Sequence, residues 1–335
     1  MKKRIISLVL AAVLVLSLTA CGEQTADMGT SNSDLVYAMV STTGSGYVAA
    51  AALADVINNN VDGLTVSCEV CGGLETLCQM IEAGEVDMAN SATGIVYQYT
   101  KGVGFAEAIG PSEHIRILLP REVCGAHFVT TADRNDINTF RDFEGKKVVV
   151  GPSGSTIDNL AREIVPALGM NIKLVNATWG DCANALQDGD ADGFWVVTTP
   201  PYSTITELES AIELKYLTME ESDMEQVVNQ YPWESIGMLN GSVYKYCDED
   251  WLTLTSSFMT IASDRISQEE GYQIVKATVE NLDDLKLAAA PFETFQIEDA
   301  ISYGCVLHAG LVQYLVEQGF DVPEDLIPAE YVPVA

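Results

Sequence analysis

Basic side chains are scarce in this sequence. Lys and Arg together number 17 against 48 Asp and Glu, and the formal net charge is −31 at pH 7. A surface of this charge repels nucleic-acid phosphates and anionic membranes. We therefore expect no nucleic-acid partner, and we expect any membrane attachment to use something other than surface charge.

Charged residues are few overall, at 19% of the chain against 48% hydrophobic residues. This balance excludes a disordered acidic chain and supplies enough apolar material for buried cores. The length of 335 residues favours two domains or one large domain.

Long hydrophobic runs are absent beyond the N-terminal region. There, Ile5 to Leu18 is apolar except for two serines, follows Lys2-Lys3-Arg4, and is short for a transmembrane helix. The next residues, Thr19-Ala20-Cys21-Gly22, complete a lipobox. This pattern predicts cleavage after residue 20 and a lipid on Cys21, and an ordinary signal peptide followed by an incidental cysteine is the alternative.

The lipobox sets the expected location of the protein. Residues 1–20 are predicted to be a lipoprotein signal peptide, and the small polar residues 21–34 a flexible tether. We expect an extracytoplasmic protein whose only membrane attachment is a lipid anchor on the outer face of the cytoplasmic membrane, within the periplasm if an outer membrane is present.

Histidines and regularly spaced cysteines are also scarce. The chain has three His and eight Cys, and removing Cys21 leaves an odd number that is atypical of a disulfide framework. Cys68 and Cys71 have C-x-x-C spacing without a second such pair, which favours buried thiols or one disulfide over zinc or redox chemistry. His127, in an apolar stretch, is interpreted as a hydrogen-bonded structural residue. We expect no metal, no cofactor, no catalytic residue and no enzymatic activity.

One strand-turn-helix plan occurs twice in the chain. Its alternation of strands and helices predicts parallel sheets, and its duplication predicts two similar lobes. In the first copy, strands are expected at 35–40, 64–70 and near 88–89, with helices over 48–57 and 77–81. In the second copy, strands are expected at 148–151, 173–175 and 194–197, with helices over 157–168 and near 183–186.

The tail is expected to return to the first lobe. A strand is predicted at 257–262, Ser267 with Glu270 forms a capping box that opens a helix, and another helix is predicted over 311–316. We expect an α/β fold with lobe 1 at 35–129 plus 259–335, lobe 2 at 130–258, and two crossing strands as the hinge.

The two Gly-Ser turns are the best candidates for ligand contacts. Each follows a strand and opens a helix, where backbone N–H groups and the helix dipole favour an anion. The expected ligand-binding residues are Thr43, Gly44, Ser45, Gly46 and Tyr47 in the first turn, Gly73 in a second glycine turn, Gly154, Ser155 and Thr156 in the matching turn of the second copy, and Asn90, Ser91, Thr198 and Thr199 after later strands.

Arg121, Trp179 and Trp195 are further residues with the size or charge to line a ligand site. Arg121 is a candidate for a bidentate carboxylate contact, with a surface salt bridge as the alternative. Trp179 and Trp195 are assigned to the core. Gly44-x-Gly46-x-x-Ala49 with Glu69 downstream fits a dinucleotide fingerprint, which keeps a dinucleotide-dependent enzyme as a less favoured alternative.

These motifs together resemble the TAXI family, the solute-binding subunits of TRAP (tripartite ATP-independent periplasmic) transporters. The matching stretches run in order through nearly the whole mature chain, although His308-Ala309-Gly310 stands where the family usually has His-Pro-Gly. They include Thr42-Thr43-Gly44-Ser45-Gly46-Tyr47, Cys71-Gly72-Gly73, Ala83-Gly84-Glu85-Val86-Asp87, Ser153-Gly154-Ser155-Thr156, Asp188-Gly189-Asp190-Ala191-Asp192 and Tyr231-Pro232-Trp233.

The resemblance implies a two-lobed, type II periplasmic-binding-protein-like fold with a ligand cleft between the lobes. It implies capture of a small organic anion, such as a dicarboxylate, a 2-oxoacid or an amino acid like glutamate, for TRAP membrane subunits that use an ion gradient. It also implies ligand contacts from both Gly-Ser turns. A lipoprotein that presents its ligand to a sensor or to an ABC-type permease is the alternative.

Overall fold

The computed structural model describes residues 33–42 and 45–334. The predicted signal peptide and Cys21 lie outside these ranges. Strand β1 begins at Ser33, so Ser33 and Asp34 belong to the strand and not to the expected tether. Within the described ranges, no helix combines the length and apolar character that crossing a membrane requires.

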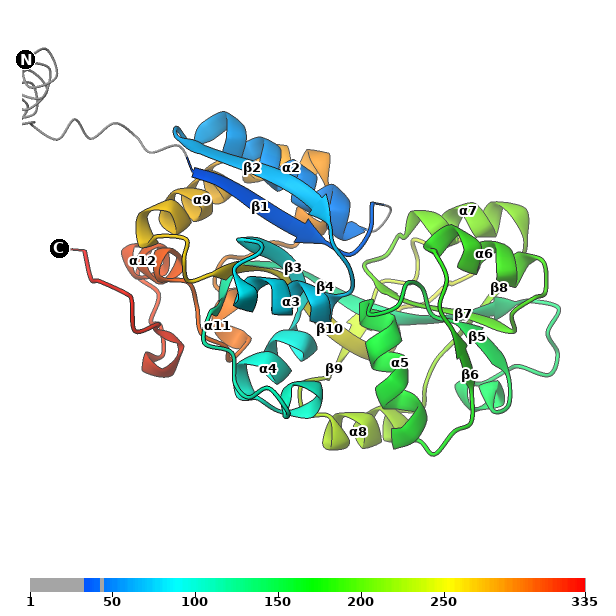
Figure 1. Cartoon of the computed structure of the whole chain (residues 1–335). Helices are drawn as coiled ribbons and strands as arrows, with labels where there is room; N and C mark the ends of the chain where they lie inside the picture. Colours follow the sequence, from blue (N-terminus) through cyan, green and yellow to red (C-terminus); the bar gives the residue numbers. More distant parts are fainter. Residues whose placement is uncertain (1–32, 43–44, 335) are drawn as a thin grey trace, which may run out of the picture. The chain divides into compact units, whose positions relative to one another are not determined.

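A single mixed sheet organises the described residues (Figure 1). Its strands are β1 (Ser33–Met39), β2 (Leu64–Val70), β3 (Met88–Ala92), β4 (Ile115–Thr131), β5 (Lys147–Val149), β6 (Lys173–Val175), β7 (Gly193–Thr198), β8 (Leu214–Leu217), β9 (Ser235–Leu239) and β10 (Trp251–Ser263). The main strand order is β2-β1-β3-β10-β4-β7-β5-β6, with β8 pairing with β4 and β9 with β10.

Helices flank this sheet. The α-helices are α2 (Ser45–Asn60), α3 (Leu74–Ala83), α4 (Thr93–Lys101), α5 (Thr156–Ala167), α6 (Trp179–Gln187), α7 (Ser203–Ala211), α8 (Glu221–Gln230), α9 (Gln268–Glu280), α10 (Leu282–Ala288), α11 (Asp299–Ser302) and α12 (Ala309–Glu317). Short 3-10 helices are η1 (Gly104–Ala106), η2 (Phe140–Phe143), η3 (Ala290–Phe292) and η4 (Glu324–Leu326). The predicted capping box at Ser267 and Glu270 is confirmed at the start of α9.

The expected duplication is visible in the strand pairing. Strand β1 pairs in parallel with β2 and β3, and β5 pairs in parallel with β6 and β7, so the two copies have the same local order. The strands β4 and β10 lie between the copies and run antiparallel to each other and to their outer neighbours β7 and β3. The sheet is therefore mixed, whereas the sequence predicted only its parallel parts.

Two lobes follow from how the apolar side chains cluster. The first lobe has one core, which takes the start of β4, from Ile115 to Leu119, and the end of β10 from Met259. The second lobe has two smaller cores, which take β4 from Cys124 onward and β10 up to Leu254. The topology confirms an α/β, two-lobed, type II periplasmic-binding-protein-like fold with two crossing strands. The lobe boundaries at 129/130 and 258/259 stay a prediction, because both lobes share one sheet.

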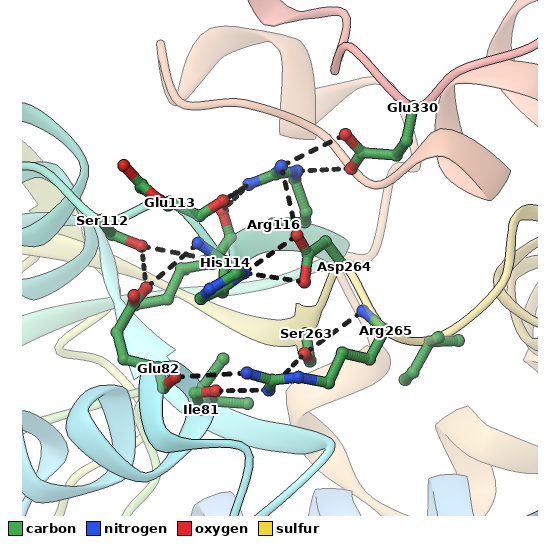
Figure 2. Close-up of polar contacts among 12 residues, drawn as sticks. Ile81, Glu82, Ser112, Glu113, His114, Arg116, Ser263, Asp264, Arg265 and Glu330 are labelled. Atoms are coloured by element: carbon green, nitrogen blue, oxygen red, sulfur yellow. Dashed lines mark hydrogen bonds and ion pairs between the residues drawn. The ribbon is translucent and has the colours of Figure 1, made fainter.

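A polar network ties the far end of the first lobe together (Figure 2). The Arg116 guanidinium in β4 donates to both carboxylate oxygens of Glu330, at 2.7 and 3.2 Å, and so holds the C-terminal segment. Arg265, just after β10, donates to the backbone oxygens of Ile81 and Glu82 at the C-terminal end of α3. A cation at a helix C-terminus also interacts favourably with the helix dipole.

Two carboxyl groups meet beside the junction of the lobes. The indole N–H of Trp233 donates to Glu163 Oε1 at 2.9 Å, and Glu163 and Glu234 line the same small cavity. A Cβ added to Gly94, in α4 of the first lobe, would lie 2.8 Å from Glu234 Oε1, so this pair touches the opposite lobe. Burial raises the pKa of Glu163 to about 7, and burial with repulsion from Glu163 raises the pKa of Glu234 well above its usual value.

The raised pKa values predict a stability term that depends on pH. The folded state keeps protons on this pair that the unfolded chain releases near pH 4.5, so the stabilisation is complete below that pH and is lost as pH rises through about 7. We expect the free energy of unfolding of wild type, relative to Glu163→Gln, to fall by on the order of 2 kcal/mol between pH 4.5 and 8. Urea unfolding at several pH values measures this difference.

The control for this prediction is Glu225→Gln, which removes an exposed carboxyl from α8. Its pH dependence is expected to follow that of wild type. A Glu163→Gln variant whose stability has the same pH dependence as wild type would contradict the raised pKa of Glu163.

Candidate functional site

A cleft of about 80 Å³ opens where the carboxyl ends of β1, β3, β5 and β7 meet the crossing strands. This is where ligands bind in open α/β sheets. The cleft is lined by Val40, Ser41, Ser45, Gly46, Tyr47, Leu74, Asn90, Ser91, Arg121, Ser155, Thr156, Ile157, Trp179, Val196, Val197, Thr198, Tyr202 and Phe258. These residues come from both copies of the repeated plan and from both crossing strands.

The structure brings most of the expected ligand-binding residues together. Ser45, Gly46, Tyr47, Asn90, Ser91, Ser155, Thr156 and Thr198 all line the cleft. Gly73, Gly154 and Thr199 do not line it. Thr43 and Gly44 lie outside the described residues, and the role of all these residues in ligand binding stays a prediction.

Gly73 and Gly154 contact each other beside the cleft. A Cβ added to Gly73 would lie 2.8 Å from the Gly154 Cα, and one added to Gly154 would lie 2.9 Å from the Gly73 Cα. The backbone N–H of Leu74 donates to the Gly154 carbonyl at 3.0 Å. Only glycine permits so close an approach of two backbones, so these turns join the lobes beside the cleft.

The second Gly-Ser turn uses its backbone donors internally. The Gly154 N–H donates to Asp158 Oδ2 at 2.9 Å, and the Ser155 N–H donates to the Pro152 carbonyl at 3.1 Å. The Ser155 hydroxyl caps helix α5 by accepting from the Asp158 N–H. The buried Asp158 carboxylate therefore lies at the anion-favouring end of α5 and takes up the Gly154 donor.

The one charged side chain among the described residues that line the cleft is Arg121. It is 3% exposed, and its guanidinium donates two parallel hydrogen bonds to the Glu122 carboxylate, from Nε to Oε2 at 3.1 Å and from Nη2 to Oε1 at 3.0 Å. We call this bidentate ion pair the fork. Burial is the largest effect and disfavours the charged form, but the Glu122 carboxylate, together with Tyr37 and Cys124, holds the pKa of Arg121 above its usual value. The alternative of a surface salt bridge is wrong, because this ion pair is buried at the cleft.

A β-bulge explains how adjacent residues form this fork. In β4 and β10, Val123 pairs with Ser257 and Pro120 pairs with Met259, so Arg121 and Glu122 together oppose Phe258 alone. Consecutive side chains on a regular strand point to opposite faces, whereas a bulge re-aims them. The bulge therefore lets Arg121 and Glu122 meet in the middle of a crossing strand.

A network of buried side chains orients Arg121. Its Nη1 donates to Asn90 Oδ1 at 2.6 Å, and the Tyr37 hydroxyl donates to the same oxygen at 2.7 Å. Asn90 Nδ2 donates to the Gly46 carbonyl at 2.9 Å, and the Tyr37 hydroxyl also lies 2.6 Å from the Thr260 hydroxyl. Asn90 thereby joins β3, β4 and the start of α2 at the cleft.

Apolar side chains form much of the second-lobe wall. Trp179 is half-buried: it packs against both second-lobe cores, as assigned, and it also lines the cleft, which was not predicted. Trp195 is fully buried in a second-lobe core as expected. A Cβ added to Gly151 would lie only 2.2 Å from the Trp179 ring, so a glycine is required beneath it. Eight further residues line the cleft and were not predicted as site residues, although several of them follow or end predicted strands: Val40, Ser41, Leu74, Ile157, Val196, Val197, Tyr202 and Phe258.

The remaining candidates lie outside the cleft. His127 is fully buried, with Nδ1 2.9 Å from the Gly125 carbonyl and Nε2 3.0 Å from the Tyr244 hydroxyl, which confirms its structural interpretation. Burial lowers the pKa of His127 to about 4.

Glu69 is exposed on β2, and the seven cysteines of the described chain are free thiols. Groups of three or more His, Cys, Asp or Glu side chains placed to hold a metal are absent from the described residues.

Several solved structures resemble the chain at low sequence identity. The periplasmic aliphatic sulphonate binding protein SsuA from Escherichia coli is 11% identical, with 81% of this chain and 82% of that chain covered and a TM-score of 0.43. The probable amino-acid ABC transporter extracellular-binding protein ytmK from Bacillus subtilis is 12% identical, with 76% and 95% covered and a TM-score of 0.43. A mutant of ArgBP from T. maritima is 14% identical, with 76% and 91% covered and a TM-score of 0.44.

Sequence comparison identifies the family. No curated protein matches the chain. The model of the NMT1-like family matches residues 38–319, which include every described residue that lines the cleft. This match covers most of the chain, and the protein therefore belongs to the NMT1-like family.

Proposed function

We propose that this protein is an extracytoplasmic solute-binding lipoprotein that captures a small organic anion. The observation that carries the proposal is Arg121 at the cleft. Three of its five N–H groups have partners, two on Glu122 and one on Asn90, which leaves up to two for a bound carboxylate. A charge-assisted bond to a carboxylate is stronger than a bond between neutral groups.

The cleft has the composition of a binding site. Its described lining contains hydroxyl, amide and guanidinium groups between apolar side chains, and it contains no His, Cys, Asp or Glu. General acid–base catalysis mostly uses His, Asp or Glu, and a Ser or Thr nucleophile is usually activated by such a base beside it. The lining therefore supports capture of a solute without chemical conversion. The proposed solute is an organic anion of the dicarboxylate, 2-oxoacid or amino acid class.

Ligand capture would use closure of the lobes. The strands β4 and β10 are the crossing segments about which the lobes open and close, and the ligand bridges the two walls in the closed form. The contact between Gly73 and Gly154 and the bond from Leu74 to Gly154 join the lobes beside the ligand.

The membrane partner is proposed from the sequence resemblance. The TAXI-like motifs favour delivery of the solute to TRAP membrane subunits, and the lipobox at Cys21 favours attachment to the outer face of the cytoplasmic membrane by a lipid. Delivery to an ABC-type permease or to a sensor is the alternative.

Arg121→Lys tests the anion site. Lysine keeps a positive charge beside Glu122 but loses the fork, so we expect a folded protein that binds its carboxylate at least roughly tenfold more weakly. Isothermal titration calorimetry on refolded, ligand-free protein measures the affinity, with a panel of dicarboxylates, 2-oxoacids and amino acids. Arg116→Lys, in the same strand but paired with Glu330 at the far end, is the control and is expected to bind like wild type. Equal affinity of the Arg121 variant would remove Arg121 from the site.

Thr156→Val tests the contribution of the second turn. The change is nearly isosteric and removes one hydroxyl from the cleft, so we expect binding to weaken by about 1 kcal/mol without loss of folding. Thr206→Val removes a hydroxyl that bonds to the Ser203 carbonyl in α7, outside the cleft, and is expected to leave binding unchanged. Calorimetry that finds the same affinity for both variants would contradict the assignment of Thr156.

The energy source of uptake separates the proposed partners. For TRAP subunits, we expect uptake of the labelled solute by cells to stop when ionophores collapse the ion gradients and to persist when ATP is depleted with the gradient maintained. Uptake that instead follows ATP would point to an ABC-type permease, and the absence of uptake by cells that hold the bound solute would point to a sensor.

A further inference from the structure

The charged group and the amide side chain of the cleft lie on a crossing strand and on the first lobe. The side chains of Ser41, Ser45, Asn90 and Ser91 line this wall, together with Arg121 of β4. Asn90 and Arg121 are joined by a hydrogen bond of 2.6 Å, so their donors and acceptors are held in fixed directions. A carboxylate therefore finds its strongest partners on this side of the cleft.

The opposite wall is mainly apolar. Ile157, Trp179, Val196, Val197 and Tyr202 come from four elements of the second lobe or their flanking residues, and all line the cleft. The hydroxyls on this wall belong to Ser155, Thr156 and Thr198 with that of Tyr202. Such a wall accommodates an apolar body and at most a neutral polar group such as a 2-oxo or hydroxyl oxygen.

Among the described residues that line the cleft, none except Arg121 carries a charge. Among the described residues that line it, none has a carboxylate to pair with an ammonium group, and Thr43 and Gly44 bring no charged side chain either. The nearby Glu122 has both oxygens engaged by Arg121. Arg121 is one cation, already paired, and a second carboxylate would face the apolar wall. Burying an unpaired charge is strongly unfavourable.

The size of the cleft sets a further limit. A volume of about 80 Å³ corresponds to roughly five to eight water-sized sites at 10–15 Å³ each. A short branched or linear carbon skeleton fits this space.

We infer that the captured solute is a small monocarboxylate with an apolar body, of the short-chain fatty acid or branched 2-oxoacid class, without an ammonium group or a second carboxylate. This inference rests on the proposed function and narrows its ligand class. The carboxylate binds Arg121 and the first-lobe hydroxyls. The 2-oxo oxygen, where the solute has one, accepts from the Thr156 hydroxyl, and the apolar body packs against the apolar side chains of the second-lobe wall.

The test is a matched ligand panel on the full-length protein, measured by isothermal titration calorimetry after refolding to remove bound solute. Isovalerate and 2-oxoisovalerate carry one carboxylate, valine adds an ammonium group, succinate adds a second carboxylate, and isovaleramide removes the charge. We expect isovalerate or 2-oxoisovalerate to bind at least roughly tenfold more tightly than valine, succinate and isovaleramide, since each of these lacks the charge or adds one that stays unpaired.

The outcomes separate this inference from the proposed function. If valine or succinate binds as tightly as isovalerate and 2-oxoisovalerate, the monocarboxylate class is overturned while capture of an organic anion stands. If no carboxylate binds, both are overturned.

A variant of the apolar wall tests the orientation of the ligand. Val197→Thr is nearly isosteric and places a hydroxyl against the apolar body, so we expect the affinity for isovalerate to fall by roughly tenfold. Val175→Thr makes the same change at a half-buried position of β6 outside the cleft and is expected to bind like wild type. Thermal unfolding verifies that both variants fold. Unchanged affinity of a folded Val197→Thr would overturn the contact between the ligand body and the second-lobe wall.

Discussion

The buried ion pair between Arg121 and Glu122 is the constraint around which the cleft is built. It lies at a bulge in β4, opposite Phe258 of the other crossing strand, and therefore at the junction of the two lobes. Two charges in this position are costly unless they are paired with each other and supported by further hydrogen bonds. The two bonds to Glu122 and the bond to Asn90 supply that compensation. Asn90 is itself held by hydrogen bonds with Tyr37 and with the start of α2. The same contacts that make the pair tolerable also aim the remaining guanidinium donors.

The repeated plan explains where this pair can be used. The orders β2-β1-β3 and β6-β5-β7 face each other across β10 and β4, so the carboxyl ends of strands from both copies reach one cleft. The symmetry is in the backbone and does not extend to the chemistry. One wall carries the guanidinium and most polar groups, while the other carries Trp179, Ile157 and the valines of β7. Such an asymmetric cleft suits a ligand with two chemically different ends.

Local periodicity was sufficient for much of the fold and for part of the site. The strands and helices of both copies follow from alternating apolar runs and turn residues, and strand ends identified Asn90, Ser91 and Thr198 as wall residues. The bulge at Arg121 was not predictable, because it depends on the register with β10, more than a hundred residues away in the chain. The turn at Gly154 shows a second limit. Its composition indicated free N–H donors, but Asp158, four residues later, takes one of them. The meeting of Glu163 with Glu234 likewise exists only once the chain has folded.

The contact between Gly73 and Gly154 provides a backbone amide hydrogen whose exchange with solvent reports the opening of the lobes. The Leu74 amide hydrogen is bonded to the Gly154 carbonyl of the other lobe, and two glycines shield that bond by bringing backbone against backbone. Separating the lobes breaks this bond while leaving the helix that begins at Leu74 intact. Exchange of this one hydrogen with solvent deuterium therefore reports the fraction of time that the lobes stand apart, without a label and without knowledge of the solute.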